Sequence, residues 1–326
     1  MLISVAIATY NRASMAAEAI GAALDQSLTP GEVIVADDAS TDSTAQVLEE
    51  LRAQDGRVRV IRQQSNTGGV RNWNRAMEAA TGEFIAWCSD DDRFLPGHLA
   101  ASVQYLKANP SVGFVHSGFV DSIETAEGTV RQPRTLRSQQ ATRLTHEDLF
   151  TYLLCYYDWP FHPSTIVMRR EVWRQVGPFD PRYELADTDW FVRAVSQYPA
   201  VLLPRHGVLN RRHAGNWSNR VGSACMQAEI FAIVDRAMLR RWPHASVSRM
   251  VWRTLWSLNV RLRLALTIRA RLRSGHQAAA LAAWDSFTEL VGRPLPAWAR
   301  RAGAAVIRRW PTGQVGEAGQ TSVSPL

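Results

Sequence analysis

The chain has 326 residues, of which 46% are hydrophobic, and a net charge of +7. This length allows two domains, or one large domain with an appendage, and a sizeable core. The three cysteines, Cys88, Cys155 and Cys225, form no Cys-x-x-Cys pair, which argues against a structural zinc site and favours a reducing compartment. No run reaches the roughly 18 apolar residues of a membrane span, so an integral membrane protein is not expected.

The charge divides the chain into two parts. Residues 236–310 hold fifteen arginines, no lysine and only two acids, a net charge of +13, so the remainder of the chain carries −6. We therefore predict a mildly acidic α/β part, residues 1–218, a basic helical region, 219–312, and a disordered tail, 313–326.

Short β-rich runs alternate with helical patterns through the first hundred residues. The apolar start lacks a basic region and predicts a strand rather than a signal peptide, so we expect a cytoplasmic protein. The predicted strands cover residues 2–9, 32–37, 57–61 and 83–88, and the predicted helices cover 14–26, 43–54 and 70–80. Such alternation is typical of βαβ units and a mostly parallel sheet.

Polar clusters follow each of these four strands: "TYNR", "DDASTD", "NTGG" and "SDDD". In open parallel α/β sheets, ligands bind beyond the carboxyl ends of the strands. The clusters are therefore predicted to converge on one cleft. Residues 1–100 and residues 101–218 would form the two halves of the α/β part.

The triplet Asp90, Asp91 and Asp92 directly follows an apolar strand. Adjacent carboxylates at a strand end fit a solvated turn, a helix N-cap or a site for a hard divalent cation. A second acidic pair at 37–38 ends a second strand, which favours the cation. Mg²⁺ or Mn²⁺ prefers one or two carboxylates together with phosphate oxygens, so a metal ion carrying a diphosphate is the predicted partner.

These stretches resemble glycosyltransferase family 2, whose members have a GT-A type nucleotide-sugar fold. The resemblance rests on "ATYNR", "VIVADDASTDST" and "NTGGVRNWNRAMEAATGEFIAWCSDDDRFLP". The last stretch fits N-x-G-x5-N-x5-A-x-G-E-[FY]-I, and the resemblance covers roughly residues 2–218. It implies an α/β GT-A type fold with a mostly parallel sheet and helices on its flanks, followed by the basic helical appendage.

The resemblance also implies a donor site. Thr9, Tyr10 and Arg12 match the loop beside the nucleotide base and ribose, and Asp38 matches the carboxylate that accepts the imide N–H of uracil. "DDAS" also fits a capped turn. The motif adds Asn66 and Gly68. Asp91 best matches the metal-binding carboxylate, with Asp92 as a second candidate ligand and Asp90 beside them; which of the three touches the metal stays open.

An acceptor-side match follows at "FHPSTIVMRREVWRQVGPFDPRYELADTDWFVRAV". Counting back from Arg193, Asp187 takes the position of the general base, and Asp189 is its rival. Both also fit helix N-terminal carboxylates favoured by the helix dipole. Finally, "RRHAGNWS" resembles the closing element in which Arg211, Arg212 and His213 face the donor diphosphate.

The resemblance thus implies an inverting transfer of a sugar from a nucleoside diphosphate donor, most simply uridine-linked, to an acceptor hydroxyl of a glycan or glycolipid, as in bacterial surface polysaccharide assembly. Asp187 would serve as base and a divalent metal ion would stabilise the leaving group. The alternatives are a nucleotidyltransferase, whose usual Gly-rich phosphate loop with Lys is missing from "ATYNRAS", and a noncatalytic sugar-nucleotide sensor or scaffold.

Residues 249–275 place tryptophans and leucines among seven arginines. Such a helix can lie on an anionic membrane surface, which predicts a protein peripheral to the inner face of the membrane. The apolar side can equally pack on the catalytic part. Nucleic acid is the least favoured partner, because no recognised binding module accompanies the basic residues.

Overall fold

The computed structural model divides the chain into two compact units, Met1–Asn216 and Trp217–Leu326. In the first unit the structure describes residues 2–125, 128–133, 140–144 and 161–216. In the second it describes residues 229–230, 232–233, 236, 269, 272, 281 and 284. Each unit is considered by itself.

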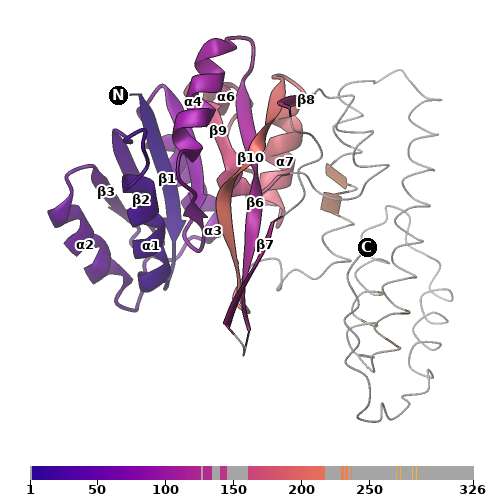
Figure 1. Ribbon diagram of the computed structural model, residues 1–326. Helices are drawn as coiled ribbons and strands as arrows, with labels where there is room; N and C mark the ends of the chain where they lie inside the picture. The colour runs from indigo at the N-terminus through magenta and orange to yellow at the C-terminus, as the bar shows by residue number, and fades with distance from the viewer. Residues whose placement is uncertain are drawn as a thin grey trace. The chain divides into compact units, whose positions relative to one another are not determined.

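The first half of the sheet is parallel and is built from βα units (Figure 1). Its strands run in the order β3-β2-β1-β4. The strands are β1 (Ile3–Thr9), β2 (Glu32–Asp37), β3 (Val58–Arg62) and β4 (Phe84–Ser89). The connecting helices are α1 (Ala13–Leu24), α2 (Thr44–Gln54) and α3 (Gly69–Glu78). Every residue of β1 and β2 is buried, because helices cover both faces of a parallel sheet.

The second half of the sheet continues as β9-β6-β10-β5, with β7 paired to β6 and β8 to β10. Here β9 (Ile166–Arg169) runs antiparallel to both β4 and β6, whereas β10 (Ala200–Arg212) is parallel to β6 (Phe114–Thr125). The shorter strands are β5 (Arg93–Phe94), β7 (Gly128–Pro133) and β8 (Thr142–Leu144). The helices are α4 (His98–Ala108), α6 (Arg170–Val176) and α7 (Ala186–Val195), with a 3₁₀ turn η1 at Pro163–Thr165. The sheet is thus parallel in its first half and mixed in its second.

The two faces of the sheet have different cores. Aliphatic side chains of α1, α2 and α4 pack with alternate strand residues such as Phe84, Ala86 and Cys88. On the opposite face Trp87 contacts Trp73 and Phe179, with ring centroids 5.1 and 4.5 Å away. Because side chains alternate along a strand, β4 supplies both cores. The strand that precedes the acidic triplet is therefore anchored on both sides.

The predicted strands and helices of the first hundred residues are confirmed, with ends shifted by one or two residues. Gly82, just before β4, has a role that the sequence did not show. A Cβ at this position would lie 2.7 Å from the backbone nitrogen of Ser4, and the Gly82 N–H donates to the Ser4 hydroxyl at 2.8 Å. Only glycine allows β4 to approach β1 so closely at this point.

In the second unit, every residue that the structure describes is helical. Leu272 is 7% exposed and packs with Leu281 and Trp284, whereas Arg269 is exposed. At these positions apolar side chains pack within the unit and an arginine faces outward. Most of the predicted amphipathic segment 249–275 and the whole predicted tail 313–326 lie outside the described residues. Among the described residues, no helix is long and apolar enough to cross a membrane.

Candidate active site

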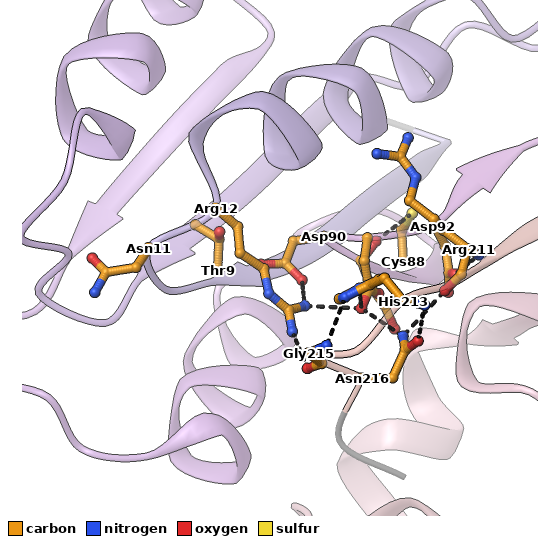
Figure 2. A network of polar contacts seen from close by, with 12 residues as sticks. Thr9, Asn11, Arg12, Cys88, Asp90, Asp92, Arg211, His213, Gly215 and Asn216 are labelled. Atoms are coloured by element: carbon orange, nitrogen blue, oxygen red, sulfur yellow. Dashed lines mark hydrogen bonds and ion pairs between the residues drawn. The ribbon is translucent and has the colours of Figure 1, made fainter. Parts of the chain in front are cut away.

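The four polar clusters that follow β1, β2, β3 and β4 are linked to one another by hydrogen bonds and ion pairs, in agreement with the predicted convergence. Asp90, Asp91 and Asp92 follow β4, and the guanidinium group of Arg12 reaches them from the start of α1 (Figure 2). Arg12 Nη1 lies 2.8 Å from Asp90 Oδ1 and 2.9 Å from Asp91 Oδ2. These carboxylates raise the pKa of Arg12 against the opposing effect of burial. Sequence analysis placed Arg12 beside the nucleotide; in the structure it is the counter-ion of the triplet.

A loop that follows β10 closes over the same carboxylates. His213 Nε2 lies 3.1 Å from Asp91 Oδ2, and Asn216 Nδ2 lies 3.2 Å from the same oxygen. The Gly215 carbonyl accepts a hydrogen bond from Arg12 Nη2 at 3.0 Å. Asn216 also fixes the loop itself, because its amide accepts from the His213 N–H and donates to the Arg211 carbonyl. Side-chain nitrogens of Arg12, His213 and Asn216 therefore converge on one oxygen of Asp91.

Asp90 and Asp92 are buried and Asp91 is partly exposed, and the charges of the triplet are incompletely balanced. Burial raises the pKa of Asp90 to about 6; Arg12 opposes this rise and the neighbouring Asp91 adds to it. Asp92 is 1% exposed, and burial followed by repulsion from Asp91 raises its pKa well above the usual range. A positive charge near these groups would therefore be strongly stabilised.

Asp92 lies deepest of the three and contacts residues of the η1 turn. It accepts a hydrogen bond from the Ser164 hydroxyl at 2.5 Å and one from the Arg211 N–H at 3.4 Å. His162 Nδ1 lies 3.5 Å from Asp92 Oδ2. Burial lowers the pKa of His162, although Asp91, Asp187 and Asp121 oppose the shift. Asp92 is thus held by protein groups rather than turned toward a ligand.

Asp38 orients the loop before α3. Its Oδ1 accepts from the N–H and hydroxyl of Thr67, both at 2.8 Å, and its Oδ2 accepts from the Gly68 N–H at 2.8 Å. Asn66 Oδ1 also accepts from Gly68 N–H at 3.2 Å, and Gly68 has a φ of +91°, which favours glycine. A carboxylate offers about four acceptor positions, so one remains on Asp38 for a ligand.

The loops after β1 and β2 are tied to one another. Asn11 N–H donates to the Ser40 hydroxyl at 2.9 Å, and Asn11 Oδ1 accepts from the Thr41 N–H at 2.8 Å. Asn11 and Ala39 both have positive φ, 52° and 61°, a conformation that costs an alanine free energy and is typical of functional loops. Thr9 is 3% exposed beneath these loops, whereas Tyr10 is 42% exposed beside them.

The two candidate bases lie in the first turn of α7 and differ in their partners. Asp189 Oδ2 lies 2.7 Å from Arg193 Nε and the residue is 8% exposed. Asp187 Oδ1 accepts a hydrogen bond from the Thr188 N–H at 2.7 Å. Within the described residues Asp187 forms no ion pair, and burial raises its pKa. Asp189 is therefore committed to a salt bridge, which leaves Asp187 as the better candidate for a base.

The two arginines at the end of β10 do not act alike. The guanidinium group of Arg211 pairs with Glu18 of α1, away from the triplet, while its backbone N–H faces Asp92. Arg212 is exposed and acts electrostatically on His162. The structure thus brings Arg12, the triplet and His213 together, and directs the side chain of Arg211 elsewhere.

Sequence analysis missed four residues of this site: Glu18, His162, Ser164 and Asn216. His162 and Ser164 belong to "FHPS", directly before the antiparallel strand β9, and Asn216 belongs to "RRHAGNWS". Their types gave no signal by themselves, because serine, asparagine and a single histidine occur commonly in loops. Their roles depend on contacts with residues that lie far away in the sequence.

The donor set can be compared with what a divalent cation needs. Among the described residues no group of three or more His, Cys, Asp or Glu side chains could hold a metal ion. A cation that binds a diphosphate needs fewer protein ligands, since phosphate oxygens complete its shell. The Asp91 carboxylate and the His213 imidazole, already 3.1 Å apart, are suitable ligands for such an ion. The residues therefore fit a metal–diphosphate complex but not a metal site made by protein alone.

The family model described as "Glycosyl transferase family 2" matches residues 4–176. The chain belongs to this family. An uncharacterised glycosyltransferase of Nostoc sp. is 34% identical over 184 residues, which are 56% of this chain and 55% of that protein. The putative teichuronic acid biosynthesis glycosyltransferase TuaG of Bacillus subtilis is 28% identical, over 44% of this chain and 58% of the relative. The chain thus spans little more than half the length of these two family 2 relatives.

A third relative is the GalNAc(5)-diNAcBac-PP-undecaprenol beta-1,3-glucosyltransferase of Campylobacter jejuni, 35% identical over 35% of this chain and 36% of that protein. Among solved structures, S. aureus TarS 1–349 in complex with UDP-GlcNAc has a TM-score of 0.62 at 18% identity, and the match covers 94% of this chain and 89% of TarS 1–349. The predicted α/β GT-A type fold of this family 2 member is thereby confirmed.

Proposed function

We propose that this family 2 member transfers a sugar from a uridine diphosphate donor to an acceptor hydroxyl, with inversion, during assembly of a bacterial surface polysaccharide or glycolipid. The observation that carries the proposal is the convergence of Arg12, His213 and Asn216 on the Asp91 carboxylate at the carboxyl end of β4. The family match supports sugar transfer over nucleotidyl transfer. The UDP-GlcNAc and UDP complexes of TarS support a uridine donor, and the names of two relatives support surface glycan synthesis.

Asp91 and His213 are the residues that would hold a divalent cation, Mn²⁺ or Mg²⁺. Bound there, such an ion would act as a Lewis acid on the diphosphate leaving group. Arg12 balances Asp90 and Asp91 in the free protein. With a donor bound, its guanidinium group would stabilise phosphate oxygens, for which arginine is well suited.

The uracil ring would lie by the loops that follow β1 and β2. Asp38 is oriented by Thr67 and Gly68 and retains an acceptor position on Oδ2, which suits the imide N–H of uracil. The exposed ring of Tyr10 would cover the base. These loops are linked through Asn11 and Ser40, so the base site would be largely formed before the donor binds.

Asp187 would take the proton from the acceptor hydroxyl as the new glycosidic bond forms. A raised pKa makes a carboxylate a stronger base as long as it remains ionised at the working pH. Because burial raises the pKa of Asp187, we expect the transfer rate to fall in acid at a higher pH than an ordinary aspartate would give. Asp189, which is paired with Arg193, would stabilise the start of α7 through this salt bridge.

The test is a panel of nucleotide sugars with Mn²⁺, scored by UDP release and by transfer to cell-envelope glycan or lipid-linked acceptors. We expect Asp91→Asn to lower transfer about 10³-fold, since it removes several kcal/mol of charge stabilisation. Asp187→Asn should lower it about 10²- to 10⁴-fold. The control is Asp55→Asn. Asp55 forms an ion pair with Arg57 that is remote from this site, so this variant should keep full activity.

Wild-type rates in both the Asp91 and Asp187 variants would overturn the assignment. Donor binding without turnover by the wild type on any acceptor would favour the sensor or scaffold instead. The predicted membrane association of residues 249–275 is separate and can be tested by sedimentation with anionic vesicles. Binding that fails to decrease as salt rises would contradict it.

A further inference from the structure

His162 lies beside the acidic triplet, with Nδ1 3.5 Å from Asp92 Oδ2. It directly precedes η1, and its carbonyl accepts hydrogen bonds from the N–H and hydroxyl of Thr165 at 2.9 and 2.6 Å. Its ring contacts Phe119, with centroids 5.2 Å apart. The backbone and one face of the ring are therefore fixed by neighbouring groups.

The two nitrogens of the His162 ring have different surroundings. Nδ1 is buried without a hydrogen-bond partner and lies 3.5 Å from Asp92 Oδ2. Nε2 is not among the buried unpaired atoms, and the side chain is 21% exposed. When Nδ1 carries the proton toward Asp92, Nε2 presents a lone pair to the site, because a neutral imidazole has one donor and one acceptor nitrogen.

Charged groups from both halves of the proposed reaction act on this ring. Asp91, the candidate diphosphate-side ligand, and Asp187, the candidate base, both act on it, together with Asp121 and Arg212. In an inverting displacement the nucleophile and the leaving group lie on opposite faces of the anomeric carbon. The sugar being transferred would therefore occupy the space between Asp91 and Asp187, and the His162 ring, which lies beside Asp92, would adjoin it.

We propose that His162, oriented through Nδ1 by Asp92, accepts a hydrogen bond at Nε2 from a hydroxyl group of the sugar being transferred. This inference rests on the proposed function. It gives Asp92 the role of a positioning residue for His162 rather than that of a metal ligand. It also makes His162 a determinant of which donor sugar is bound, since a site that hydrogen-bonds a hydroxyl discriminates against a sugar that lacks or misplaces it.

Two substitutions separate the two nitrogens. The amide of an asparagine can stand in for Nδ1, whereas that of a glutamine can reach the place of Nε2. His162→Asn is therefore expected to keep the contact with Asp92 and lose the contact with the sugar. His162→Gln is expected to keep the contact with the sugar at least in part.

Calorimetry with Mn²⁺ would compare UDP with UDP-glucose, UDP-galactose, UDP-GlcNAc and UDP-GalNAc. We expect the wild type to bind one of these sugars more tightly than UDP, and His162→Asn to lose about fivefold of that preference, the effect of one neutral hydrogen bond. Its affinity for UDP should stay within twofold of the wild-type value. His162→Gln should recover most of the preference. Thermal unfolding would confirm that both variants fold.

A second measurement needs no ligand. In protein labelled with ¹⁵N-histidine, the His162 signals, identified by their loss in His162→Asn, should show the proton on Nδ1. A proton on Nε2, or an unchanged sugar preference in His162→Asn, would overturn this inference while leaving the proposed function intact. Failure of the wild type to bind any UDP compound would instead overturn the uridine donor, and this inference with it.

Discussion

Buried carboxylates lie at both ends of the parallel strands, and their surroundings differ. At the amino end Glu32 is 2% exposed and accepts hydrogen bonds from the Ser4 hydroxyl at 2.7 Å and from the N–H and hydroxyl of Thr81 at 2.8 and 2.7 Å. Arg59 pairs with its second oxygen. Burial opposes ionisation here, but these hydrogen bonds outweigh it and lower the pKa of Glu32.

At the carboxyl end, the effect of burial on the pKa of Asp90 outweighs that of its ion pair and hydrogen bonds. Three carboxylates are adjacent, but Arg12 pairs only with Asp90 and Asp91, and burial raises the pKa of Asp90 to about 6. A carboxylate that is fully hydrogen-bonded stabilises the fold, whereas carboxylates crowded together in a buried place weaken it unless a cation joins them. This difference marks the amino end as structural and the carboxyl end as the functional site.

The largest expected effect is on Glu32. Glu32→Gln should lower the free energy of unfolding by about 3 kcal/mol, because it leaves Arg59 without its partner and turns an amide N–H₂ toward groups that already donate. Urea unfolding in EDTA would measure it. The matching change at the other end, Asp90→Asn, should cost less than about 1 kcal/mol or increase stability, since it relieves repulsion. Equal losses in the two variants would contradict the comparison.

A smaller effect is expected from Arg12. Arg12→Gln removes the counter-ion of Asp90 and Asp91 and should lower the free energy of unfolding by about 1–2 kcal/mol, less than for a fully buried pair because the side chain is 27% exposed. Mn²⁺ together with UDP should then stabilise this variant less than it stabilises the wild type, because the guanidinium group that would contact the phosphate oxygens is lost. Thermal unfolding with and without Mn²⁺ and UDP would measure both. An equal shift in the variant and the wild type would argue against contact between Arg12 and the donor phosphates.

The smallest effect is expected for the change in the free energy of unfolding per pH unit. The pKa of Asp90 is about 6 in the folded protein, above the ordinary aspartate value of 3.8. Between these pH values the folded state binds more protons than the unfolded state, so this group's contribution to stability falls as pH rises, by at most about 1.4 kcal/mol per pH unit. For Glu32 the sign is opposite, because its lowered pKa makes its contribution fall as pH decreases below about 4.5.

Unfolding in EDTA between pH 4 and pH 7 would resolve the Asp90 contribution. The difference in free energy of unfolding between Asp90→Asn and the wild type should grow in favour of the variant from about pH 4 to pH 6 and then level off. A difference that shrinks over this range would show that Arg12 outweighs burial at Asp90.

The amino-acid sequence by itself determined the strands and helices of the first hundred residues and the place of the triplet. Apolar runs, turn residues and the family pattern are local signals, and β1, β2 and β4 must end at one edge of a parallel sheet. The meeting of Arg12 with the residues after β4 followed from that topology. The ion pairs that Arg12 forms there could not be predicted from the topology, because an ion pair depends on side-chain directions.

Only the tertiary structure decided which acids are free and which are held. Asp187 and Asp189 are both candidate bases in the sequence, yet only Asp189 is paired with Arg193. Likewise, the side chain of Arg211 pairs with Glu18. Asn216 donates a hydrogen bond to Asp91. Gly82 shows the same limit, because its need for glycine comes from Ser4 on another strand. Burial and pairing are long-range properties, and they set the charge of each carboxylate and hence its chemistry.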